Sequence, residues 1–148
     1  MKQSIDRKYV LDLLKHLLIT PSPSGYCHKI MKTIEEEAGK LGLQYEYTNK
    51  GCGLISVPGQ DSSRTIGLSA HVDTLGAMVR SIKDSGRLRL TPIGGYMMAS
   101  LENEYCLIHT RAGKVYEGTI QTTHPSVHVF PDAREQKTGR REHGNPHR

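Results

Sequence analysis

The spacing of apolar residues changes after Gly42, and this change constrains the fold more than any other feature. Before Gly42, apolar residues recur every three or four positions, which predicts two amphipathic helices. The first helix is predicted over residues 4–19, and the second ends at Gly42. After Gly42, short β-type runs follow at 44–49, 53–57 and 65–70. Two helices followed by strands predict the opening of an α/β layer.

Residues 20–25, of sequence T-P-S-P-S-G, separate the two predicted helices. Ser24 is predicted to cap the second helix, because serine side chains accept hydrogen bonds from the first free backbone N–H groups. The apolar face predicted for the second helix consists of Ile30, Ile34, Ala38 and Leu41. Three consecutive acids, residues 35–37, point in different directions on a helix, so we interpret them as a solvated face.

The run at 65–70, T-I-G-L-S-A, is of the sort that forms a strand inside a sheet covered on both faces, so we predict a buried strand there. From residue 77 to 130 helical periodicity is absent, and the chain predicts short strands separated by glycine and turn residues. These strands are predicted around 77–82, 87–90, 104–110, 115–120 and 127–130. Their spacing predicts a small β-barrel or sandwich, with a domain boundary at 74–76.

Charge and composition exclude several classes of function. The formal net charge of +5 is spread widely and the chain has one Phe, so we expect no nucleic-acid partner. Its longest apolar stretches are shorter than the ~18–20 residues that span a bilayer, and no signal-peptide core follows Met1, so we expect a cytoplasmic protein without a membrane partner. Cys27, Cys52 and Cys106 lack any C-x-x-C pair, which predicts free thiols.

The candidate chemistry lies at His71 and Asp73, directly after the apolar run. Side chains two residues apart on an extended strand face the same way, so the imidazole and the carboxylate share one face. Zinc sites use such a pair, the histidine as ligand and the carboxylate as its orienting partner or as support for the catalytic base. The same pattern is also found as an ordinary surface histidine near an aspartate.

The remaining histidines and the cysteine–histidine neighbours are interpreted as structural or exposed residues. Cys27 and His28 diverge at a helix start, so we do not predict a thiol nucleophile there. Gly94 and Gly95 form a predicted turn, because no helix of the required spacing follows for phosphate binding. The other histidines interpreted in this way are His109, His124, His128, His143 and His147.

Several ordered segments resemble the dinuclear-metal aminopeptidase family that includes the tetrahedral, glutamyl and deblocking aminopeptidases and the "cellulase M" group. They are A-H-V-D-T-L-G-A-M-V at 70–79, S-G-R-L-R-L-T-P-I-G-G-Y at 85–96, E-Y-C-L-I-H-T at 104–110, G-K-V-Y-E-G-T-I at 113–120 and S-V-H-V-F at 126–130. The T-P-S-P-S-G segment also fits this family. The similarity runs in order from about residue 10 to 132.

The resemblance implies an α/β fold class: the N-terminal part of a metallopeptidase catalytic domain, residues 1–75, followed by an incomplete inserted β-barrel or PDZ-like dimerisation domain, residues 76–132. It further implies that His71 is a zinc or cobalt ligand and that Asp73 supports catalysis. The implied activity is metal-dependent removal of N-terminal residues from peptide substrates. The implied partner, through the β-rich insert, is a second copy of the chain in a homo-oligomer.

The resemblance also implies that most catalytic groups of the family come after the insert and have no counterpart in these 148 residues. One ligand cannot hold a catalytic zinc, so we expect the isolated chain to be inactive and to bind metal weakly at most. We interpret residues 133–148 as an out-of-frame or disordered tail, with a frameshift before Glu142. A rival hypothesis is a noncatalytic β-rich association module left by gene truncation.

Overall fold

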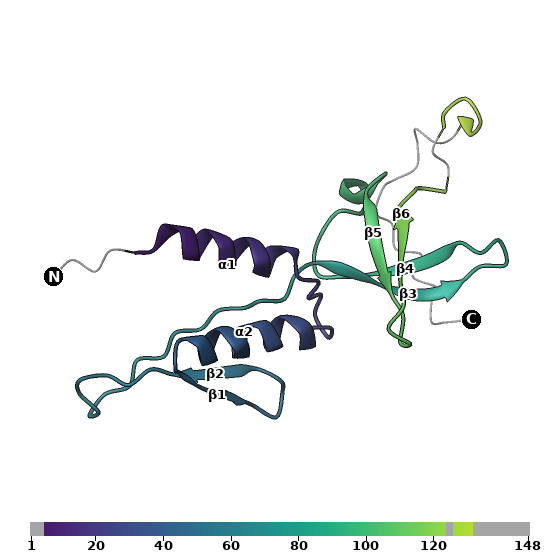
Figure 1. The fold of residues 1–148 in the computed structure, drawn as a ribbon. Helices are drawn as coiled ribbons and strands as arrows, with labels where there is room; N and C mark the ends of the chain where they lie inside the picture. Colours follow the sequence, from purple (N-terminus) through teal and green to yellow (C-terminus); the bar gives the residue numbers. More distant parts are fainter. Residues whose placement is uncertain (1–4, 124–125, 132–148) are drawn as a thin grey trace. The chain divides into compact units, whose positions relative to one another are not determined.

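The computed structural model describes residues 5–123 and 126–131 and divides into two compact units, Met1–Gly94 and Gly95–Arg148 (Figure 1). Its elements mix helices and strands. In chain order they are α1 (Arg7–Ile19), α2 (His28–Lys40), β1 (Gln44–Tyr47), β2 (Gly53–Ser56), β3 (Gly76–Ile82), β4 (Leu88–Ile93), the 3-10 helix η1 (Met98–Leu101), β5 (Tyr105–His109) and β6 (Val115–Thr119). Within the described ranges, none of the helices is long and apolar enough to cross a bilayer.

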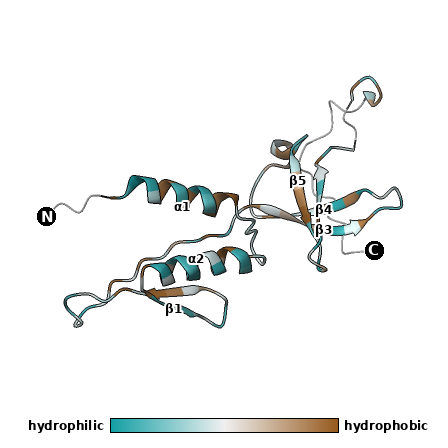
Figure 2. Cartoon of the chain, viewed as in Figure 1, coloured by the Kyte–Doolittle hydropathy of each residue, from teal (hydrophilic) through white to brown (hydrophobic). Residues whose placement is uncertain are grey.

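The first predicted helix is confirmed as α1, apart from its predicted start at Ser4, which lies outside the described residues. Asp6 caps α1 by accepting a hydrogen bond from the Tyr9 backbone N–H, at 3.0 Å. Hydrophobic and hydrophilic stretches alternate along the ribbon of this helix (Figure 2). Leu13 and Leu17 are half-buried, and no residue of α1 is buried. Its apolar face is therefore only partly covered by the described residues.

The second helix, α2, carries the two buried apolar side chains of the described residues. Ile30 is fully buried and Ala38 nearly so, and both belong to the predicted apolar face. Helix α2 packs against the β1–β2 hairpin. The predicted stop is confirmed: Gly42 has φ +69°, and the Leu43 N–H reaches back to the Ala38 carbonyl, the C-terminal arrangement that favours glycine.

The predicted cap of α2 is wrong. The helix begins at His28 with Cys27 at the N-cap position, where no side-chain hydrogen bond is made. Ser24 lies one turn upstream, and its hydroxyl donates instead to the Asp73 carboxylate. The carboxylate is a charged acceptor, and hydrogen bonds to charged groups are stronger than those between neutral groups.

The strands form three separate antiparallel pairs among the described residues: β1 with β2, β3 with β4, and β5 with β6. The β3–β4 pair contains a register shift between Val79 and Ser81. These hairpins confirm the strand predictions around 44–49, 53–57, 77–82, 87–90, 104–110 and 115–120. They also confirm a mixed helix and strand chain. A barrel or PDZ-like insert, and the domain limits 1–75, 76–132 and 133–148, stay predictions.

Three sequence-based expectations differ from the structure. The run at 65–70 is no strand and is exposed, with Ile66 at 87% and Leu68 at 96%, because no neighbouring strand pairs with it in the described chain. Residues 127–129 form a turn, closed by the Phe130 N–H to the Ser126 carbonyl at 2.8 Å. The 3-10 helix η1 lies in a region where only strands were predicted.

Candidate functional site

His71 and Asp73 meet as the sequence predicts. His71 Nδ1 lies 3.0 Å from Asp73 Oδ1 and 3.3 Å from the Asp73 carbonyl oxygen. The His71 side chain is 85% exposed and that of Asp73 is 42% exposed. The imidazole is therefore open to solvent, and Nε2 is the ring nitrogen that Asp73 does not engage.

The segment that joins α1 to α2 holds this pair in place. Ser24 Oγ donates to Asp73 Oδ2, the carboxylate oxygen that does not face His71. Ser22 is fully buried and its hydroxyl donates to the Val72 carbonyl at 2.8 Å. The Thr74 N–H donates to the Ser22 carbonyl at 2.9 Å. Chain positions some 50 residues apart thus form one small anchored site.

A short parallel bridge completes this anchor. Pro23 pairs with Thr74, two residues before β3 begins. The first residue of β3 is Gly76, where an added Cβ would lie 2.6 Å from Pro23 Cβ. Glycine is therefore required by the close approach of the proline ring.

The electrostatics of the site favour an ionised carboxylate. The hydrogen bond from Ser24 and, after it, that from His71 hold the pKa of Asp73 below its ordinary value. An ionised carboxylate only accepts hydrogen bonds. This favours a His71 tautomer that carries its proton on Nδ1 and keeps the Nε2 lone pair available.

The donor set fits part of a metal centre. A metal-binding histidine almost always donates its other ring N–H to a carboxylate or carbonyl, which is the arrangement of His71 with Asp73. A catalytic zinc takes about three protein ligands. Within 5–123 and 126–131, no group of three or more His, Cys, Asp or Glu side chains could hold a metal ion. The described residues thus offer one histidine with its orienting carboxylate.

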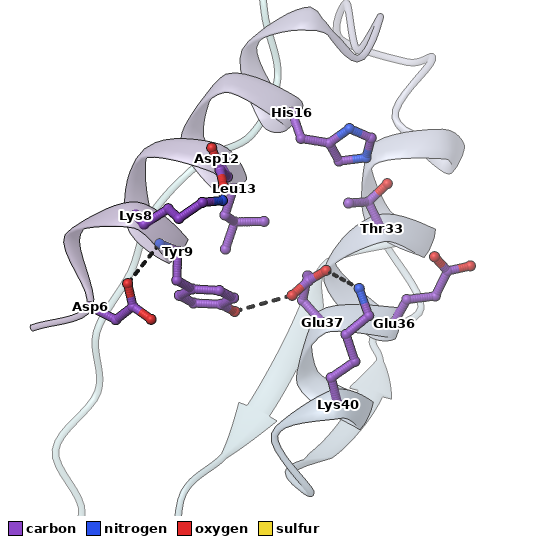
Figure 3. Close-up of a pocket in the computed structure, with 10 residues that line it drawn as sticks. All are labelled: Asp6, Lys8, Tyr9, Asp12, Leu13, His16, Thr33, Glu36, Glu37 and Lys40. Atoms are coloured by element: carbon purple, nitrogen blue, oxygen red, sulfur yellow. Dashed lines mark hydrogen bonds and ion pairs between the residues drawn. The ribbon is translucent and has the colours of Figure 1, made fainter.

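A groove between α1 and α2 is a second place where charged side chains gather (Figure 3). Tyr9 Oη donates to Glu37 Oε2 at 3.1 Å, and Lys40 Nζ lies 2.5 Å from Glu37 Oε1. Lys40, followed by Tyr9, holds the pKa of Glu37 below its ordinary value. These groups satisfy one another at the surface, so we assign them to holding the helices together. Glu37 departs from the predicted solvated face in this respect.

As predicted, Cys27 and His28 show no arrangement of a thiol nucleophile with its base. The Cys27 thiol donates to the Ser22 and Pro23 carbonyls, and the His28 ring packs edge-on against Tyr26, so Cys27 and His28 have different partners. The three cysteines are free, as predicted. His124, His143 and His147 lie outside the described residues.

Sequence reasoning missed Ser22 and Ser24 as parts of the site. The T-P-S-P-S-G motif marked a break between helices, and its serines suggested only capping. The available signal was the recurrence of hydroxyl side chains beside prolines, since such residues satisfy polar groups of other segments when they do not cap a helix. The pairing partner, residues 72–74, is too distant in sequence to be identified from spacing.

Comparisons with known proteins agree with the motifs. The sequence profile described as M42 glutamyl aminopeptidase matches residues 51–143, more than half of the chain. "Putative aminopeptidase YhfE" of Bacillus subtilis (strain 168) is 44% identical over 123 residues, which are 83% of this chain and 36% of that protein. The chain thus spans about a third of the length of this relative.

Two solved structures share the fold. An aminopeptidase of the archaeon Desulfurococcus kamchatkensis matches with a TM-score of 0.76 and 27% identity, over 90% of this chain and 35% of its own. A TET aminopeptidase of a marine sediment archaeon, Thaumarchaeota archaeon SCGC AB-539-E09, matches with a TM-score of 0.78 and 23% identity, over 91% and 37%. The predicted resemblance is thereby confirmed: this chain belongs to the M42 glutamyl aminopeptidase family.

Proposed function

We propose that this chain carries the amino-terminal part of the active site of a metal-dependent aminopeptidase that removes N-terminal residues from peptides. His71 is proposed as a zinc or cobalt ligand, and Asp73 as the acid that supports it. The observation that carries this proposal is the 3.0 Å contact between His71 Nδ1 and Asp73 Oδ1 on an exposed site.

The proposed roles of the two residues follow from their chemistry. A bound metal ion supplies Lewis-acid polarisation of the scissile carbonyl group. Asp73 accepts a hydrogen bond from the Nδ1–H group of His71, which keeps the ring in the tautomer that offers Nε2 to a cation. As an ionised group next to the ligand, Asp73 also stabilises positive charge at the site.

We further propose that the chain alone does not hydrolyse peptides. His71 with Asp73 provides fewer than the about three ligands of a catalytic zinc site. The matched segment covers about a third of the length of the relatives. We propose that the remaining ligands belong to the part of such proteins that lies outside this segment.

Self-association through the second unit is also part of the proposal. Large apolar side chains of the β5–β6 hairpin are exposed, with Tyr105 at 86% and Leu107 at 55%. Exposed apolar residues that cluster on one element favour association with another protein surface. We propose a second copy of the chain as the partner.

The test compares the isolated chain with a chimera. In the chimera, the matched region of this chain replaces the corresponding 123 residues of the Bacillus subtilis relative. With zinc or cobalt and a chromogenic amino-acid anilide, the chimera is expected to turn over substrate and to lose this activity with a chelator. The isolated chain is expected to show none, and turnover by it would contradict the proposed inactivity.

Variants of the chimera assign the residues. His71→Ala is expected to abolish turnover, and Asp73→Asn to reduce it about 10–100-fold, the usual cost of losing the partner of a metal-binding histidine. His16→Ala, an exposed histidine on α1, is the matched control and should leave the rate unchanged. Full activity of the His71→Ala chimera would remove His71 from the proposed site.

A further inference from the structure

We propose that Ser24 is a positioning residue of this site, which fixes the Asp73 carboxylate so that Asp73 in turn fixes the His71 ring. The inference deepens the proposed function and rests on it for the role of His71. The hydroxyl of Ser24 is bonded to Asp73, so its effect on His71 passes through Asp73.

The Asp73 carboxylate is shared between two hydrogen-bond donors, Ser24 and His71. Oδ2 accepts from Ser24 Oγ, while Oδ1 lies 3.0 Å from His71 Nδ1. Rotation of the carboxylate about its last torsion is broad and roughly two-fold when the group is free. A hydrogen bond to each oxygen restricts that rotation and keeps one oxygen directed at the ring.

The His71 side chain is 85% exposed, so packing of neighbouring side chains does little to orient its ring. Its polar contacts in the described chain are those of Nδ1 with Asp73, at 3.0 Å to the carboxylate and 3.3 Å to the carbonyl. The orientation and tautomer of the imidazole therefore depend on where Asp73 is held.

The backbone around Ser24 is fixed by contacts of its neighbours, Ser22 and Pro23. Ser24 directly follows Pro23, and Asp73 directly precedes Thr74. Because Pro23 pairs with Thr74, Ser24 and Asp73 are the neighbours of the same bridge, one on each of the two paired segments. The buried Ser22 binds the Val72 carbonyl and receives the Thr74 N–H. Ser24 can thus position Asp73, because its backbone is anchored independently of its hydroxyl.

The position of Ser24 requires a side chain with a hydroxyl group, which donates to Asp73. Ionised Asp73 needs donors, and Ser24 supplies a neutral one that leaves the negative charge of the site unchanged. Ser24→Thr keeps that donor, whereas Ser24→Ala leaves Oδ2 to water. Since Ser24 is exposed, the alanine variant is expected to keep the fold.

The experiment records the ring ¹⁵N resonances of His71 in the whole chain, at a pH where ordinary imidazoles of pKa about 6.5 are neutral. In the unsubstituted chain we expect the tautomer protonated at Nδ1. Ser24→Ala should shift the two ring nitrogens toward the ordinary tautomer mixture, and Ser24→Thr should restore them. Asp73→Ala removes the carboxylate and leaves the backbone carbonyl of residue 73 as the partner of His71 Nδ1. This variant therefore shows the largest shift of the ring nitrogens that loss of the carboxylate can cause.

Two controls separate positioning from a general loss of structure. Ser62→Ala, at an exposed turn of the same unit, should leave the His71 resonances unchanged. The Thr74 amide resonance should be retained in Ser24→Ala, since its bond to the Ser22 carbonyl does not involve Ser24. If Ser24→Ala loses this resonance, Ser24→Gly repeats the test with a second variant that lacks the hydroxyl.

The outcomes distinguish this inference from the proposed function. Unchanged His71 nitrogens in Ser24→Ala would overturn the role of Ser24, whatever the metal does. Addition of zinc to the chimera should perturb His71 Nε2, with an affinity about 10–100-fold weaker when Ser24→Ala is introduced. If zinc perturbs no His71 nitrogen in the chimera while the tautomer in the whole chain still follows Ser24, the metal-ligand proposal fails and the positioning inference stands.

Discussion

Two neighbouring stretches of the chain have opposite environments. Residues 65–70 are apolar, yet they form no strand, and Ile66 and Leu68 are almost fully exposed. Residues 71–74 are more polar, yet they are fixed by Ser22, Pro23 and Ser24. The geometry of the site therefore comes from the contacts of residues 22–24 with residues 72–74, called the clamp below, whereas burial of the preceding run requires strands that the described residues do not provide.

The physical reason lies in what each stretch needs. An extended apolar run gains free energy only when other apolar surface covers it and other backbone groups pair with it. A polar turn needs only a few hydrogen-bond partners, and residues 22–24 supply them. The clamp is therefore expected to persist whether or not the apolar run is covered.

The largest expected effect is that of Gly76→Ala. Its new Cβ would meet Pro23 Cβ at 2.6 Å, so the clamp must shift, and overpacking of this kind costs about 1–3 kcal/mol. We expect a lower free energy of unfolding and faster amide exchange at Thr74. Denaturant unfolding and hydrogen exchange measure the two effects.

Gly67→Ala, in the exposed apolar stretch, is the matched control. An added Cβ there meets no atom of the described residues within 4 Å, so the change in stability should stay within about 0.5 kcal/mol. Equal effects of the two substitutions would erase the difference between the two stretches.

Ser22→Ala has the next largest expected effect. It removes the hydrogen bond to the Val72 carbonyl from a fully buried side chain, at a cost of about 0.5–1.5 kcal/mol. Ser69→Ala, an exposed serine of the apolar stretch, serves as its control. Thermal unfolding of the two variants should separate them, and a larger loss for Ser69→Ala would reverse the comparison.

The smallest expected effect on stability is that of replacing Ile66 and Leu68 together by threonine. Both side chains are already exposed, so the free energy of unfolding should change by about 0.5 kcal/mol or less per site. Self-association should fall, because an exposed apolar extended run favours edge-to-edge pairing. Sedimentation at several concentrations measures the self-association, and denaturant unfolding measures the stability. A loss of several kcal/mol in the free energy of unfolding would reveal that the run is buried in solution.

The sequence predicted those parts of the fold that depend on local pattern. Helical spacing located α1 and α2, Gly42 marked a helix end, and β-type runs between glycine and turn residues located the strands of the three hairpins. The spacing of His71 and Asp73 predicted that they meet. These features depend on a few consecutive residues, whose geometry a period of two or 3.6 residues already specifies.

The failures have a non-local cause. The run at 65–70 was predicted to be buried because its composition fits a covered strand, but burial is decided by partners elsewhere in the fold. Ser24 was predicted to cap α2 because it precedes the helix. The prediction failed because the acceptor that Ser24 binds instead, Asp73, lies 49 residues away in sequence. Spacing within one segment contains no information about either partner.

Anomalous diffraction from a zinc-loaded crystal of the chimera described above would test whether His71 binds the metal ion. We expect a zinc ion about 2.0–2.1 Å from His71 Nε2, with Nδ1 still bound to Asp73 and Ser24 still bound to the second carboxylate oxygen. A fully loaded, active chimera whose zinc ions are bound without His71 would contradict this expectation.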